Sequence, residues 1–166
     1  MTLQTAVIVM LLAAPLVSAQ TVNPAKLKIR GVGLDSTYAQ VVGALGKPRK
    51  ESKATREECI GGREKTVEYA GLSFYFMDGD SRGGKTFEVK GFDVTSAQWN
   101  VSGVKIGDTQ AIVRQKLGRK FTTEKVEDMA ENAWVYDMGD RFGPGSTYIY
   151  FKNGKVFKIS SNFLVC

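Results

Sequence analysis

The sequence predicts an α+β protein made of two tandem helix-plus-antiparallel-sheet repeats, which form one continuous curved sheet with helices on one face. Residues 31–46 (GVGLDSTYAQVVGALG) and residues 103–118 (GVKIGDTQAIVRQKLG) share Gly, Val, Thr, Ala and Leu at one constant offset. Aromatic and β-branched runs typical of strands follow each stretch. A repeat of this length indicates a fold built from copies of one unit.

The first residues of the chain differ from the rest. Ala6–Leu12 is an apolar run, and Val17-Ser18-Ala19 is a small-residue cleavage pattern. Together they indicate a secretory signal peptide that is too short to span a membrane. We therefore predict a signal peptide at 1–20, a first repeat at 21–98 and a second repeat at 99–166, in a protein that is periplasmic or secreted.

Both copies carry the pattern of a short amphipathic helix. The apolar positions are Tyr38, Val41, Val42 and Leu45 in the first copy and Ile112, Val113 and Leu117 in the second. Asp35 or Ser36 is expected to cap the first helix and Asp108 the second, because short polar side chains accept from free amides at a helix start. Gly46 and Gly118 are expected to end the helices.

Strands are expected where apolar, aromatic and β-branched residues gather. The expected strands are Thr66–Ala70, Leu72–Met77, Lys85–Val94, Ala133–Met138, Thr147–Lys152 and Lys155–Phe163. Asn153-Gly154 is a strong signal for a two-residue hairpin. Residues 49–65 and 122–132 are polar and are expected to form loops or a poorly paired edge. Lys85–Val89 matches Lys155–Ile159 as the same strand of the two copies.

Alternation along these strands sorts the side chains onto two faces. The residues expected to face the helices are Phe74, Phe76, Phe87 and Val89 in copy one and Ile149, Phe151, Phe157 and Ile159 in copy two. The other face would then show the candidate binding residues Tyr75, Tyr148 and Tyr150, with Lys90 and Lys158 beside them. Such a composition is typical of a contact patch. An ordinary solvated sheet face also accommodates tyrosine.

Charge and cysteine content limit the possible chemistry. The net charge of +6, from 23 Lys and Arg against 17 Asp and Glu, favours an acidic partner only mildly, and a solvated surface explains it as well. Cys59 and Cys166 could form a disulfide in an oxidising compartment or remain two thiols. The chain has no His, the commonest general base and metal ligand. We predict no catalytic residue, no metal site and no cofactor.

One segment satisfies a nucleotide-binding pattern. Gly79–Thr86 fits G-x-x-x-x-G-K-[ST], whose chemistry requires a helix directly after the loop. Phe87–Val94 has a strand pattern instead, so neither nucleotide nor nucleic acid is expected as a ligand. Asp78 and Asp80 are interpreted as turn residues, because the acid that a calcium loop needs at its twelfth position is replaced by Val89.

The repeated phrase, an extended entry followed by a short helix ending in Leu-Gly and then an aromatic strand, resembles the SmpA/OmlA-like family. Two tandem copies in a secreted chain are similar to the β-lactamase inhibitor protein family. The resemblance implies a sheet whose open side grips another protein. In that inhibitor family a first-repeat hairpin with an acidic tip enters the enzyme's active site; the nearest hairpin here, Tyr69–Leu72, has no acid at its tip.

The sequence thus favours an exported, non-enzymatic protein-binding module that uses the open sheet face. Burial of the three tyrosines would supply the contact, and Lys90 and Lys158 would steer an acidic protein partner. One alternative is an inhibitor of a secreted or periplasmic hydrolase. A second is an envelope or outer-membrane assembly factor.

Overall fold

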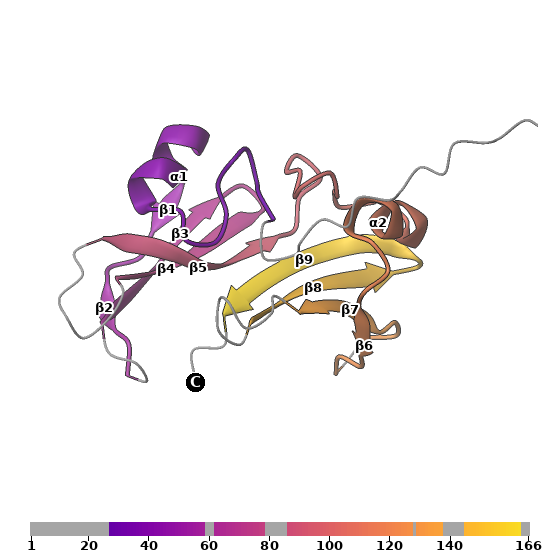
Figure 1. Cartoon of the computed structure of the whole chain (residues 1–166). Coiled ribbons are helices and arrows are strands. Elements are labelled where there is room, and N and C mark those ends of the chain that lie inside the picture. The colour runs from indigo at the N-terminus through magenta and orange to yellow at the C-terminus, as the bar shows by residue number, and fades with distance from the viewer. Residues whose placement is uncertain (1–26, 59–61, 79–85, 128, 138–144, 164–166) are drawn as a thin grey trace, which may run out of the picture.

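The computed structural model describes residues 27–58, 62–78, 86–127, 129–137 and 145–163. Its main element is one nine-stranded antiparallel sheet in the order β1-β3-β4-β5-β9-β8-β7-β6, with β2 paired to β3 (Figure 1). The strands are β1 (Lys50–Glu51), β2 (Thr55–Arg56), β3 (Arg63–Tyr69), β4 (Leu72–Asp78), β5 (Phe87–Val94), β6 (Thr122–Glu124), β7 (Ala133–Asp137), β8 (Gly145–Lys152) and β9 (Lys155–Phe163).

The expected fold class is wrong. The structure is mostly a single antiparallel sheet with two short helices, α1 (Tyr38–Leu45) and α2 (Gln110–Leu117), and not an α+β arrangement of two helix-plus-sheet units with helices on one face. The physical reason lies in the core. The helices bury only Val41, Val113 and Leu117. Irregular segments supply Leu27, Ile29, Val32, Leu34, Trp99, Val101 and Val104 to the same hydrophobic cluster.

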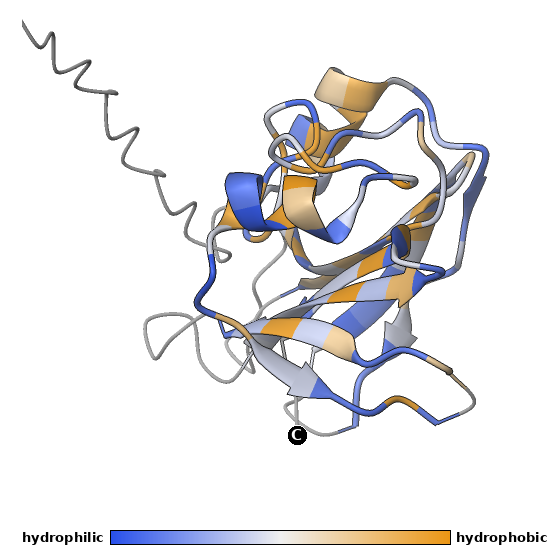
Figure 2. Ribbon diagram, turned by 90° about the vertical axis from the view of Figure 1, so that its right-hand side faces the viewer, coloured by the Kyte–Doolittle hydropathy of each residue, from blue (hydrophilic) through white to orange (hydrophobic). Residues whose placement is uncertain are grey.

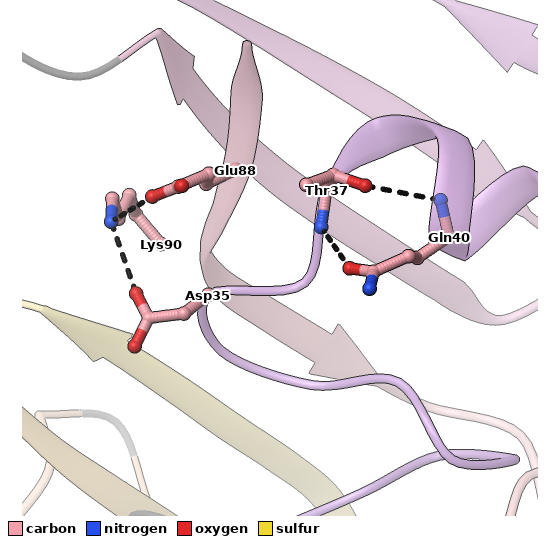
Figure 3. Close-up of polar contacts among 5 residues, drawn as sticks. All are labelled: Asp35, Thr37, Gln40, Glu88 and Lys90. Atoms are coloured by element: carbon pink, nitrogen blue, oxygen red, sulfur yellow. Dashed lines mark hydrogen bonds and ion pairs between the residues drawn. The ribbon is translucent and has the colours of Figure 1, made fainter.

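The helices begin later than expected. Thr37 caps α1 and Thr109 caps α2, each accepting an amide of the first turn. The prediction of Asp35, Ser36 or Asp108 as caps is wrong because two of these side chains stabilise the preceding turn. The Ser36 hydroxyl accepts from Gly33 N, and the Asp108 carboxylate accepts from Lys105 N. In Figure 3, Thr37 and Gln40 form the reciprocal capping box at the start of α1.

Two small turns lie beside the centre of the fold. Arg30 and Gly31 both have positive φ, and so do Ser102 and Gly103. This geometry at both central residues is that of a tight hairpin turn, and isolated bridges close the two turns at Ile29–Val32 and Val101–Val104. The two turns also contact each other, because Lys28 N donates to Ser102 Oγ at 2.9 Å and Ile29 bridges Val101.

Several strand predictions agree with the structure. The hairpin at Asn153-Gly154 joins β8 to β9, and β9 has the expected bounds. Residues 87–94 are the strand β5, as the argument against a phosphate loop requires. Residues 49–65, expected as a loop or a poorly paired edge, form the two-residue strands β1 and β2, which pair with β3 at the edge of the sheet, and the start of β3 itself. Figure 2 shows hydrophobic and hydrophilic positions alternating along the strands.

The predicted faces are correct for most residues and wrong for Phe157. Phe74, Phe76, Val89 and the isoleucines of β8 and β9 are fully buried in the core. A register irregularity between Tyr150 and Phe151 makes Val156 the core residue. The Phe157 ring instead lies 6.2 Å from that of Tyr150, on the opposite face. A bulge inserts one residue and thereby reverses the alternation that follows it.

Other predictions concern residues outside the described ranges. The signal peptide at 1–20, the cysteines at 59 and 166, and the glycine-rich part of the segment 79–85 are among them. The division into repeats at 21–98 and 99–166 also stays a prediction.

Candidate binding surface

One face of the sheet carries all three predicted tyrosines. We call it the tyrosine face and define it by Tyr75 on β4, Asp93 on β5, Tyr148 and Tyr150 on β8 and Lys158 on β9. In strand order these residues form a band across the middle of the sheet, since β4, β5, β9 and β8 are successive neighbours. Tyr75 is 42% exposed and is the exposed large hydrophobic residue of the described chain.

Asp93 connects the two ends of this band. Its Oδ2 accepts from the Tyr75 hydroxyl at 3.0 Å and lies 3.1 Å from Lys158 Nζ. The Lys158 ammonium lies in turn 5.6 Å from the centroid of the Tyr150 ring. The carboxylate therefore fixes one aromatic ring directly and a second through a cation, which reduces the side-chain entropy that a partner would have to remove on binding.

The aromatic part of the band is an ordered stack. The rings of Tyr148 and Tyr150 are stacked, with centroids 6.0 Å apart and planes at 16°. Phe157, which the sequence assigned to the core, extends this row on the same face. Tyr148 and Tyr150 are half-buried, so both rings keep accessible surface. Aromatic side chains held in this way can bury large area in a contact at low entropic cost.

Lys90 lies beside the band but is engaged within the chain. Figure 3 shows its ammonium between the carboxylates of Asp35 and Glu88, at 3.1 Å from each. Burial lowers the pKa of Lys90, but its hydrogen bonds to the two carboxylates outweigh burial and raise it. Both predicted steering cations, Lys90 and Lys158, thus have carboxylate partners in the folded chain. Their attraction for an acidic partner is smaller than the sequence suggested.

The tyrosines of the band are neutral at physiological pH. Burial, and then the charge of Asp93, raise the pKa of Tyr75 to about 12. Burial also raises the pKa of Tyr148 and of Tyr150, aided by Glu124 and by Asp93 respectively. Each hydroxyl is therefore a hydrogen-bond donor under ordinary conditions.

The surface next to Tyr75 is hollowed. A pocket of about 630 Å³ has a lining that includes Tyr75, Lys90, Asp93 and Asn162, together with Ser52 and Thr55. Gly91 lines it, and a Cβ there would lie 2.9 Å from the carbonyl oxygen of Ser161 and 3.3 Å from Tyr75 Cδ2. The absence of a side chain at this position lets the Tyr75 ring lie close to the backbone.

Sequence reasoning missed Asp93, Gly91 and the place of Phe157. A signal for Asp93 was available, because an acid between Phe92 and Val94 inside a strand must lie on the face away from the core. Nothing comparable identified Phe157, since a bulge leaves no clear trace in composition.

The described residues contain no group of three or more His, Cys, Asp and Glu that could hold a metal ion. Neither of the two helices is both long and apolar enough to cross a membrane.

Comparison with known proteins gives little similarity. No family model matches the chain, and no curated protein matches it. Among solved structures, an extracellular protein containing a SCP domain from Bacillus anthracis str. Ames is similar, with 12% identity and a TM-score of 0.45. The match covers 99% of this chain and 51% of that one, so the chain spans about half the length of that protein.

Proposed function

We propose that the chain is an exported, non-enzymatic protein-binding module whose tyrosine face contacts another protein. The observation that carries this proposal is the ordered aromatic band. Tyr75 on β4 and Tyr148 and Tyr150 on β8 keep accessible ring surface on one face, and Asp93 on β5 and Lys158 on β9 connect them. Tyrosines near the centre of a contact surface are among the side chains that most often dominate binding energies.

The partner contact is mainly aromatic in this proposal. Charge has a smaller part than the sequence suggested, because Lys90 and Lys158 have partners within the chain. Export rests on the N-terminal apolar run and its cleavage pattern. For the inhibitor alternative, the hairpin nearest to the inhibitor family's active-site hairpin is Tyr69–Leu72, and it is packed against the chain: the Ala70 carbonyl accepts from Trp99 Nε1 at 2.8 Å and also from Gln98.

The test compares affinity capture by the mature protein and by a Tyr75→Ala, Tyr148→Ala, Tyr150→Ala variant from the native envelope and culture-medium fractions. The partner should be enriched by the parent protein and lost from the variant, whose fold is checked by near-ultraviolet circular dichroism. A matched control replaces Tyr38, an aromatic residue of α1 outside the face, with Ala. Equal capture by the triple variant would reject the tyrosine face as the contact.

A further inference from the structure

The pocket beside Tyr75 has a lining unlike that of a typical apolar ligand site. Its volume of about 630 Å³ lies within the range of small-molecule sites. Its polar walls combine hydroxyl and amide side chains, from Ser52 and Thr55 at the sheet edge to Ser160 and Asn162 on β9, with about as many charged side chains. Tyr75 supplies an exposed aromatic ring at the same place. The pocket therefore offers many neutral hydrogen-bonding groups and one apolar platform.

Asp93 adds an unused acceptor to this wall. Its Oδ2 is shared by Tyr75 and Lys158, whereas its Oδ1 is buried and has no hydrogen-bond partner among the described residues. A buried acceptor without a donor is unfavourable, because it has lost its hydrogen bonds to water. Asp93 lines the pocket, so a donor that enters the pocket and reaches Oδ1 would remove this penalty.

Three of the charged side chains that line the pocket are already paired within the chain. Lys65 has an ion pair with Glu51, Lys90 has ion pairs with Asp35 and Glu88, and Asp93 has one with Lys158. An ionic ligand would have to compete with these pairs. A neutral ligand with several hydroxyl groups avoids this competition, because each hydroxyl can donate to a carboxylate or accept from an ammonium or amide.

We propose that this pocket binds a neutral oligosaccharide, with one sugar ring lying against Tyr75 and one hydroxyl donating to Asp93. The C–H groups on one side of a pyranose match the apolar face of the tyrosine ring, while the equatorial hydroxyls point to the polar walls. The binding is non-covalent. It shares Tyr75 with the protein contact proposed above, which depends on Tyr148 and Tyr150 as well.

The test is an NMR titration of the mature, isotope-labelled protein with tetrasaccharides of one size and different charge. Neutral tetramers of glucose, mannose and N-acetylglucosamine are compared with cationic chitosan tetramer and anionic tetragalacturonate. At least one neutral sugar should shift the amides of Gly91, Asp93 and Asn162 at about 10 mM ligand, a weak affinity typical of shallow sites. The charged tetramers should shift the same amides less.

Two variants locate the site. Tyr75→Ala should weaken the neutral sugar by about tenfold or more through loss of the stacking ring. Tyr148→Ala, on the same face but outside the pocket, should leave sugar binding unchanged while weakening capture of a protein partner. The wild-type shifts decide the matter if Tyr75→Ala fails to fold. Absence of shifts at the pocket with every neutral sugar, or larger shifts with a charged one, would overturn the proposal.

Discussion

The halves of the chain on either side of residue 98 use the same backbone contacts with different side chains. Asp35 N donates to Val89 O and Gly107 N to Val156 O, at 2.9 and 2.7 Å. Tyr69 and Tyr136 also have matching roles. Their hydroxyls donate to the carbonyls of Gly46 and Gly118, the residues that end the two helices.

The polar and aromatic side chains around this shared backbone differ. The first half has a complete capping box and a Lys90 ion pair to Asp35, whereas Gly107 occupies the place of Asp35 in the second. In the second half Trp134 stacks on Phe121, with centroids 4.1 Å apart. The comparison teaches that hydrogen bonds of the backbone define these local turns, while side-chain packing around them can be exchanged.

The largest expected effect tests the different packing. Trp134 is 5% exposed and contacts Phe121 and Phe151, whereas Val67, two residues before Tyr69, holds the corresponding place in the first half. Trp134→Ala should lower the free energy of unfolding by about 3–5 kcal/mol and Val67→Ala by about 2 kcal/mol. Urea denaturation measures both. Equal losses of unfolding free energy in the two variants would mean that the stacked aromatic cluster gives the second half no additional stability.

A second prediction concerns alkaline pH. Burial raises the pKa of Tyr136 to about 12, above its usual value near 10. The folded state therefore retains a proton that the unfolded chain loses, so stability present below about pH 10 declines as the pH rises toward 12. For this fully buried group the loss is up to about 3 kcal/mol.

Replacement of Tyr136 isolates its contribution to the loss of stability at alkaline pH. Tyr136→Phe should flatten the decline in unfolding free energy between about pH 10 and 12, because phenylalanine has no proton to lose. Tyr75→Phe is the matched control: its pKa is raised to a similar extent, but the ring is 42% exposed, so water screens the effect. A decline as steep in Tyr136→Phe as in the parent protein would contradict the assignment.

The third prediction compares the helix starts. Thr37→Ala should cost about 1–2 kcal/mol, because it removes half of a reciprocal capping box with Gln40. Thr109→Ala should cost about 0.5–1 kcal/mol, since among the described residues its hydroxyl accepts from Ile112 N alone, at the long distance of 3.5 Å. Thermal unfolding of the two variants gives the order, and a reversed order would rule out the capping box as the cause.

The smallest expected effect concerns substitutions at Asp35 and Gly107, two corresponding residues with left-handed backbone. Asp35 has φ +62 and Gly107 has φ +95. Asp35→Gly should change the unfolding free energy by less than about 0.5 kcal/mol, because relief of backbone strain offsets loss of the Lys90 ion pair. Gly107→Ala should be more costly than Asp35→Gly in the same denaturation assay. Comparable costs would show that strain at these turns is unimportant.

The sequence predicted correctly several features that depend on residues close to one another in the chain. Asn153-Gly154 specified its hairpin because both residues accept positive φ, and their φ angles in the structure are 53° and 68°. The three tyrosines were placed together by alternation alone. The caps were misassigned because Ser36 and Asp108 have the right chemistry but serve the turn before the helix.

The prediction of the fold class was wrong for a different reason. The cover of the sheet consists largely of irregular segments such as 27–36 and 99–106, whose apolar residues carry no helical or strand period. Their packing follows from long-range contacts, such as Ile29 with Val101, which local patterns do not encode. The pocket could not be predicted from the sequence either, because the residues that line it, Gly91 among them, come from separate strands.

The most direct test of the tyrosine face is site-specific photo-crosslinking in the native compartment. A photoreactive phenylalanine derivative placed at Tyr75 or Tyr150 should form a crosslink to one protein, and the same group at the exposed Ala39 of α1 should not. Crosslinks at Ala39 with none at the two tyrosines would contradict the account.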